Sequence, residues 1–337
     1  MKNNLKNHTR ELLLAVSIVV LVLLVGMRAP VFITGASLGN LLTDSTLLII
    51  LALAQMLIIV TRGIDLSMAS NLALSGMAAA LLASKNPDLP LVVIMLAAAA
   101  IGLVLGLVNG YLIGYLELPA IVVTLGTMSV YRGLVFVLSG GAWVSSHQMP
   151  EAFIAFPLTR LFGITYLVWI AAAAILVAWY VAFHSRFGRD LFAIGNAPSS
   201  ARYVGIPMAN RLFWTYGLAG LVSGICGYLW VARYAVAYTE IAYGFEFTVI
   251  AACVIGGISI AGGTGTVIGA VLGALFLAVI GNALPVVKVS PFWQSALTGI
   301  VILAAVLINA RDRKNAGRQI LPLHLSSRTT GHAGGTA

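Results

Sequence analysis

The stretch PLVVIMLAAAAIGLVLGLVNGYLIGY, residues 90–115, decides the fold. It contains no charged residue, and about 20 predominantly apolar residues are enough for a helix to cross a bilayer core. Gly102, Gly106, Gly110 and Gly114 recur every four residues, which puts them on one helix face. Small residues on one face let a second helix backbone approach closely. The stretch therefore predicts a transmembrane helix that packs tightly against a neighbour.

The whole chain has the same composition as this stretch. Of its 337 residues, 60% are hydrophobic and 9% are charged, whereas about 25% are charged in an ordinary soluble domain. These values exclude a soluble globular domain and a disordered chain. We predict an all-α, polytopic membrane helical bundle of about ten transmembrane helices. The expected spans are residues 11–28, 44–62, 66–84, 90–115, 119–139, 164–184, 209–232, 247–260, 265–283 and 292–310.

The basic residues indicate the orientation of the bundle. Thirteen Lys or Arg residues fall in segments that would be cytoplasmic if the N-terminus is inside, five fall in outside segments, and Arg132 lies within a span. This asymmetry is the positive-inside pattern, so the net charge of +9 reflects topology and not a nucleic-acid partner. We predict a cytoplasmic N-terminus (1–10), a transmembrane domain (11–310) and a disordered cytoplasmic tail (311–337).

Two features of the spans stand out. The eighth span is short, and Gly256-Gly257 interrupts it near its end, which is typical of a broken helix that lines a cavity or is buried in protein. A weak internal repeat also relates Gly63–Ser67 to Gly257–Ala261, so spans two to four would match spans eight to ten. Internal repeats are common in transporters.

One predicted cytoplasmic loop, residues 185–208, has features of a docking element. We expect a short helix after Pro198, capped by Ser199 or Ser200 and stopped by Gly205 and Pro207. An amphipathic helix of this kind suits a groove on a partner protein. The alternative is a plain interfacial loop.

Several motifs together resemble one family. They are Gly63-Ile64-Asp65-Leu66-Ser67, Leu118–Thr127 with Tyr131-Arg132-Gly133, Ala251–Ser259, and Gly262-Gly263-Thr264-Gly265, in addition to the 185–208 loop. From residue 35 to about 310, the chain is similar to the permease subunits of monosaccharide ABC importers, the ribose, xylose, arabinose, rhamnose and autoinducer class. Met68-Ala69-Ser70 departs from the family's usual pattern of a small residue, Gly and Ser.

The resemblance implies partners. The permease would pair with a second copy or a paralogue within the membrane lipid. A periplasmic sugar-binding protein would deliver the solute, and two ATPase subunits would each grip one 185–208 loop. The chain has no phosphate loop of the Gly-x4-Gly-Lys-Ser/Thr type. We therefore expect no enzyme activity, cofactor, metal or nucleic acid for this chain, with ATP bound by the partner. The coupling residues would be Gly188, Arg189, Gly195, Asn196, Ala201, Arg202 and Gly205.

Four polar residues in or beside spans are candidates for the translocation pathway or its gate. Arg132 would be costly unpaired in a bilayer, so it lines the solute path, lies at the subunit interface or forms a structural pair. Asn109 and Asn282 could offer amides to sugar hydroxyls or form inter-helix hydrogen bonds. Asp65 could cap the third span or take part in gating.

Two other classes of function remain open. An ion-coupled secondary transporter usually needs intramembrane carboxylates, whereas the acidic residues here lie at or near predicted span ends or in loops. A membrane enzyme would need a cluster of His, Asp, Glu or Cys at one membrane face, and the sequence shows none.

Overall fold

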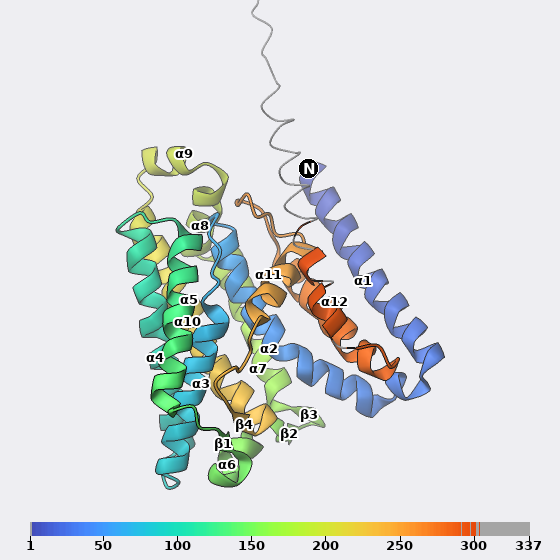
Figure 1. Ribbon diagram of the computed structural model, residues 1–337. Helices are drawn as coiled ribbons and strands as arrows, with labels where there is room; N and C mark the ends of the chain where they lie inside the picture. The colour runs from blue at the N-terminus through green and yellow to red at the C-terminus, as the bar shows by residue number, and fades with distance from the viewer. Residues whose placement is uncertain (1, 291, 297, 301–302, 304–337) are drawn as a thin grey trace, which may run out of the picture.

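The computed structural model describes residues 2–290, 292–296, 298–300 and 303 (Figure 1). The fold is almost entirely helical, with four strands of two residues each. The helices are α1 (Lys2–Arg28), α2 (Gly35–Ile59), α3 (Met68–Lys85), α4 (Leu91–Gly114), α5 (Ala120–Ser139), α6 (Glu151–Ala155), α7 (Tyr166–Trp179), α8 (Arg186–Asn196), α9 (Pro198–Tyr203), α10 (Met208–Tyr234), α11 (Phe245–Ile255) and α12 (Val267–Val286). The strands are β1 (Val144–Ser145), β2 (Arg160–Leu161), β3 (Ile164–Thr165) and β4 (Val236–Ala237).

Within the described residues, seven helices are long and apolar enough to cross a membrane. They lie in α1, α2, α4, α5, α7 with the π-helical turn that follows it, α10 and α12. Each corresponds to one of the predicted spans. Of the other three, 66–84 is α3, 247–260 contains the shorter apolar helix α11, and 292–310 falls largely outside the described residues, as does the predicted tail. Residues 2–10 continue α1 without a break.

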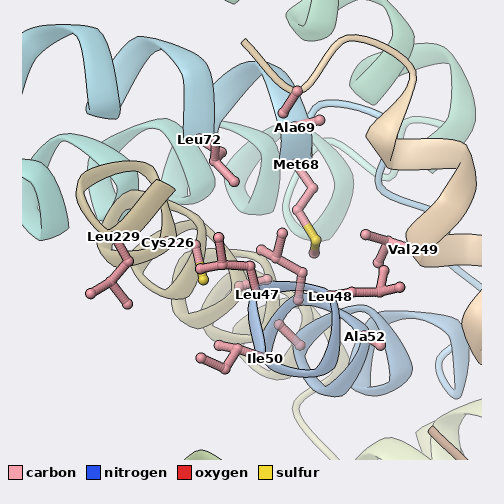
Figure 2. Close-up of a cluster of buried hydrophobic side chains, with 14 of the residues drawn as sticks. Leu47, Leu48, Ile50, Ala52, Met68, Ala69, Leu72, Cys226, Leu229 and Val249 are labelled. Atoms are coloured by element: carbon pink, nitrogen blue, oxygen red, sulfur yellow. The ribbon is translucent and has the colours of Figure 1, made fainter. Parts of the chain in front are cut away.

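Helix α2 forms the centre of the bundle. In its most apolar window 83% of residues are buried by the protein, against 22% for α4 and for α5. Figure 2 shows side chains of α2 packed among those of α3, α10 and α11; Leu47, for example, lies beside Cys226. Because lipid solvates apolar side chains as well as the protein interior does, close packing holds such helices together, more than the hydrophobic effect.

The predicted glycine face of the fourth span packs against α10. A Cβ atom on Gly102 would overlap the carbonyl oxygen of Gly220 and lie 2.6 Å from the Cα atom of Gly224. In return, a Cβ atom on Gly220 would lie 2.6 Å from the Cα atom of Gly106. The two backbones therefore touch directly, and the predicted tight packing is confirmed. We call this contact the α4–α10 seam.

The eighth span is interrupted at both ends. Helix α11 has 11 residues, about 16 Å at 1.5 Å per residue, which is too short for a hydrocarbon core of about 30 Å. The helix ends at Gly256, and Gly257 has a φ of 93°, so the predicted interruption is confirmed. Gly257–Ala261 does not open the next helix directly, since α12 starts only at Val267.

The two ends of the bundle differ in structure. Figure 1 shows α8 and α9 at one end and α6 with β1 and β4 at the other. Strand β1 pairs antiparallel with β4, and β2 pairs with β3 in a short hairpin. The predicted 185–208 loop and the 140–163 segment thus lie at opposite ends.

Candidate functional site

The 185–208 segment contains two helices. Ser185 caps α8, because its hydroxyl accepts a hydrogen bond from Gly188 N at 2.9 Å. Helix α9 begins at Pro198 after the N-cap residue Ala197, with no side-chain cap bond. The prediction that Ser199 or Ser200 caps this helix is therefore wrong: the proline at the first helical position has no N–H that needs an acceptor, and both serines lie inside the helix.

The far end of α9 is exposed. Tyr203 and Val204 are 92% and 75% exposed, and Gly205 closes the helix with a φ of 79°. Ala201 faces inward, 3% exposed. Arg202 forms an exposed ion pair with Glu117 at 3.2 Å, and such a pair contributes about 0–1 kcal/mol. The result is a protruding aromatic and aliphatic tip that the other described residues leave uncovered.

The base of this segment is joined to the membrane core. Arg62, after α2, donates from Nε to the carbonyl oxygen of Gly195 at 2.7 Å and from Nη2 to that of Asn196 at 3.0 Å. Gly263 N donates to the Val60 carbonyl oxygen at 2.8 Å. A Cβ atom on Gly195 would overlap that same oxygen. We call Val60, Arg62, Gly195, Asn196 and Gly263 the coupling junction.

One ion pair and one further hydrogen bond also hold α8. Asp190 pairs with Arg211 of α10 at 2.7 Å, and both side chains are about a quarter exposed (23% and 25%). Arg189 donates to the His184 carbonyl oxygen at 3.3 Å. The chain thus fixes α8 to α2, α10 and the loop before α12, while the tip of α9 projects freely. A push on the tip would therefore be transmitted to the bundle through α8.

Asp65 lies in a buried polar group between α2 and α3. Its carboxylate accepts from Ser67 N at 2.8 Å and from the Ser67 hydroxyl at 2.6 Å. Burial raises the pKa of Asp65, and the bonds from Ser67 oppose that rise. Asn109 donates its amide to the Ser67 hydroxyl at 2.8 Å. The structure thus brings Asp65 and Asn109 together around Ser67, where they join α3 to α4.

The other two pathway candidates are separate from this group. Arg132 of α5 donates to the carbonyl oxygens of Ile241, at 2.6 Å, and Ala242, at 3.1 Å. Its guanidinium also lies 5.5 Å from the ring centre of Tyr243. Asn282 donates to the Ala278 carbonyl oxygen of its own helix at 3.0 Å. The segment that Arg132 contacts borders a cavity.

Sequence reasoning missed α8 as a separate helix and the role of Arg62. The signal for α8 was present: Ser185 followed by apolar residues at helical spacing, Phe187, Leu191 and Ile194, of which the last two are buried. The contact between Arg62 and Gly195 joins positions 133 residues apart, so no local pattern indicates it.

Comparison with known proteins places this arrangement in a family. The sequence profile described as "Branched-chain amino acid transport system / permease component" matches residues 37–306, which include every candidate site residue named above. The chain belongs to this permease family. No solved structure matches it significantly.

Individual permeases are similar over almost their full length. The galactose/methyl galactoside import permease protein MglC of Escherichia coli (strain K12) is 33% identical, with 92% of this chain and 96% of that protein aligned. The autoinducer 2 import system permease protein LsrC of Enterobacter sp. (strain 638) is 32% identical, with 99% and 96% aligned. The family and the seven candidate spans together show that this permease is a multi-pass membrane protein.

Proposed function

We propose that the protein is the membrane-spanning subunit of an ATP-driven importer that carries a monosaccharide or similar small sugar across the bacterial inner membrane. Transport proceeds by alternating access. Partner ATPase subunits dock on α8 and α9, and a periplasmic sugar-binding protein delivers the solute at the opposite end. The chain binds no cofactor and catalyses no reaction; ATP is bound and hydrolysed by the partners.

The observation that carries this proposal is the exposed tip of α9 joined to the membrane core by the coupling junction. A partner that grips Tyr203 and Val204 moves α8, and Arg62 links α8 to the end of α2, the central helix. The α8–α9 segment is formed or supported by the predicted coupling residues, which are Gly188, Arg189, Gly195, Asn196, Ala201, Arg202 and Gly205. Asp65 and Asn109, beside the same end of α2, are placed to respond to its movement.

The sugar substrate is supported by the relatives. The names of two permeases that align over more than nine tenths of this chain state import of galactose and methyl galactoside, and of autoinducer 2. The family description mentions branched-chain amino acids, so the family as a whole covers several solutes. The aligned relatives, together with the motif resemblance, favour a sugar for this permease.

The proposed topology has ten spans with both termini cytoplasmic. It consists of the seven candidate spans, α3, the interrupted segment around α11, and residues 292–310. Helix α3 is nearly all buried among its neighbours, so it can cross the membrane despite its polar residues Asn71 and Ser75. A second permease copy or a paralogue completes the transport unit.

The test is solute-stimulated ATP hydrolysis in proteoliposomes that contain the permease, its ATPase and the binding protein. Arg202→Glu places a negative charge at the docking tip, and we expect it to lower sugar-stimulated hydrolysis at least tenfold, about 1.4 kcal/mol of lost coupling. Arg202→Lys keeps the positive charge at the same position, so it is the control and should keep coupling to the ATPase. Hydrolysis that is unchanged in Arg202→Glu would contradict the docking role of α9.

One observation favours the ion-coupled alternative. Glu246 in the first turn of α11 is 5% exposed, and its Oε2 atom has no hydrogen-bond partner among the described residues. A buried carboxylate is typical of proton- or sodium-coupled transport. Sugar uptake by the permease alone, driven by a proton or sodium gradient without any ATPase, would establish that alternative and overturn the importer proposal.

A further inference from the structure

The segment between α10 and α11 is not helical. After β4, residues 238–244 form turns, with Ala242 at a φ of 51° and Gly244 at 78°. In Figure 1, α11 lies roughly midway between the end with α9 and the end with β1 and β4. Irregular backbone at membrane depth is stable only where it is buried in protein or lines a water-filled cavity.

A cavity lies directly on this segment. Its volume is about 490 Å³, and it is lined by residues of the 238–245 segment, by Trp230 of α10, by Thr248 of α11, and by Gln294 and Ser295. Pockets for small ligands measure about 300–1,000 Å³. Discontinuous helices at such places form the solute sites of many transporters.

The lining combines aromatic rings with uncharged polar groups. Trp230, Tyr238 and Tyr243 contribute ring surfaces, and Thr248 and Gln294 contribute a hydroxyl and an amide. Among the described residues, no hydrogen bond occupies the polar side-chain atoms of Glu240, Thr248 or Gln294. Sugar rings bind to such surfaces, because their C–H faces stack on aromatic rings and their hydroxyls bond to carboxylates and amides.

The charges around the cavity select against an anionic ligand. Glu240 lines the cavity and Glu246 lies in the first turn of α11. The nearest cation, Arg132, is committed to the carbonyl oxygens of Ile241 and Ala242. A phosphate or the carboxylate of an amino acid would be repelled by these two carboxylates, and no described residue that lines the cavity is a Lys or Arg. A neutral polyhydroxylated ring meets no such repulsion.

The wall that carries Glu240 and Tyr243 is anchored at both sides. Arg132 holds Ile241 and Ala242 and lies 5.5 Å from the Tyr243 ring centre. On the other side, β4 is paired with β1, and the Trp143 ring contacts that of Tyr238 at 5.4 Å. The cavity is therefore pre-formed, which reduces the entropy lost on binding.

We propose that this cavity is a monosaccharide-binding subsite of the translocation pathway, between α11 and the end of the bundle that carries β1 and β4. The inference rests on the proposed function, since it takes the transported solute to be a sugar. Tyr243 supplies a stacking surface, Glu240 and Gln294 bond to ring hydroxyls, and Arg132 acts as the positioning residue that holds the wall in place.

The test uses a cysteine reporter in the full chain. Both native cysteines, Cys226 and Cys253, are completely buried, so their background labelling is low. Ser295→Cys is isosteric and lies in the cavity wall; Ser146→Cys is an exposed, isosteric control at the same end of the bundle but outside the cavity. Labelling by a charged, membrane-impermeant thiosulfonate is followed with D-galactose, D-ribose, L-rhamnose and their acyclic alditols.

We expect a cyclic sugar at ten times its dissociation constant to slow labelling of S295C by about tenfold. Labelling of S146C should not change, and the alditols, which lack a ring to stack, should protect S295C far less. Adding Glu240→Gln or Tyr243→Ala should shift protection of S295C to higher sugar concentrations.

The outcomes separate this proposal from the function on which it rests. If a sugar stimulates ATP hydrolysis and uptake but never protects S295C, the importer stands and the subsite is overturned. Protection by the unloaded binding protein and by no sugar would assign the cavity to protein docking, which also overturns the subsite. If no sugar drives uptake or protects S295C, both proposals fail.

Discussion

The α4–α10 seam and the segments that flank α11 are held together in opposite ways. In the seam, Gly102, Gly106 and Gly220 bring two unbroken helices into backbone contact. Around α11 and the end of α8, arginines from distant helices donate to free carbonyl oxygens. Arg132 bonds to Ile241 and Ala242, Arg62 to Gly195 and Asn196, and Arg10 to Val254 at 3.1 Å.

The difference follows from where backbone hydrogen bonds can be made. An unbroken helix satisfies its own carbonyl groups, so its faces need only shape to pack. Where a helix ends or is interrupted, its carbonyl groups need donors from elsewhere, and arginine supplies several donors in one planar group. Packed glycines make a rigid contact, whereas arginine bonds can break and re-form. We therefore expect the seam to act as the fixed half of the bundle and the α8 and α11 regions as the moving half.

The largest effect should come from breaking the seam. Gly220→Val adds a Cβ atom that would overlap the Gly102 carbonyl oxygen and press on Gly106. Because backbone must move on both helices, we expect a loss of about 3 kcal/mol or more, measured as a lower thermal unfolding temperature in detergent. Gly126→Val on α5, where a Cβ atom meets nothing within 4 Å, is the control. Equal stability of the two variants would show that the seam is not rigid.

Removing the Arg132 anchor should have the next largest effect. Arg132→Met leaves two carbonyl oxygens without their charged donor and Glu246 without a nearby cation. Because these bonds are only partly buried, we expect a loss of about 1.5–3 kcal/mol, and part of this should return when Glu246→Gln is added. The measurements are thermal stability and sugar uptake. If the double variant is no more stable than Arg132→Met, Arg132 does not stabilise the negative charge of Glu246.

The coupling junction should show a smaller effect on stability and a clear effect on coupling. Arg62 has a φ of 70°, and asparagine tolerates this conformation better than most residues. Arg62→Asn thus keeps the backbone and removes two bonds to carbonyl oxygens; because the Arg62 side chain is exposed, we expect a combined loss of about 1–2 kcal/mol. We expect ATP hydrolysis to continue while sugar uptake per ATP falls. Parallel loss or retention of both activities would argue against a transmitting role.

The smallest effect should come from Arg10. Its single described bond, to the Val254 carbonyl oxygen, is only partly buried, so Arg10→Gln should cost about 0.5–1.5 kcal/mol. Arg28→Gln at the other end of α1 is the matched control. If the Arg10 variant loses as much stability as Arg132→Met, the loss of stability does not depend on how deeply each arginine's carbonyl partners are buried.

Local patterns in the sequence were enough for much of the fold. Runs of apolar residues predicted the seven candidate spans, and the spacing of Gly102 to Gly114 predicted a tight helix contact. Gly256-Gly257 marked the interruption of the eighth span. Local patterns did not identify the cap of α9, where Ser199 and Ser200 were expected and Ala197 occupies the position. They also gave no sign that Asp65 and Asn109 would meet at Ser67.

The sequence by itself thus predicted that lipid surrounds the bundle, where the spanning helices lie, and on which helix faces glycine allows close approach. Each of these depends on residues within one or two turns of one another, so composition and spacing are sufficient. Only the tertiary structure decided which arginine serves which free carbonyl group, and that Trp230, Tyr243 and Gln294 surround one cavity. These contacts join residues that lie 10 to more than 200 positions apart. Their geometry depends on how the helices pack, and no local pattern encodes it.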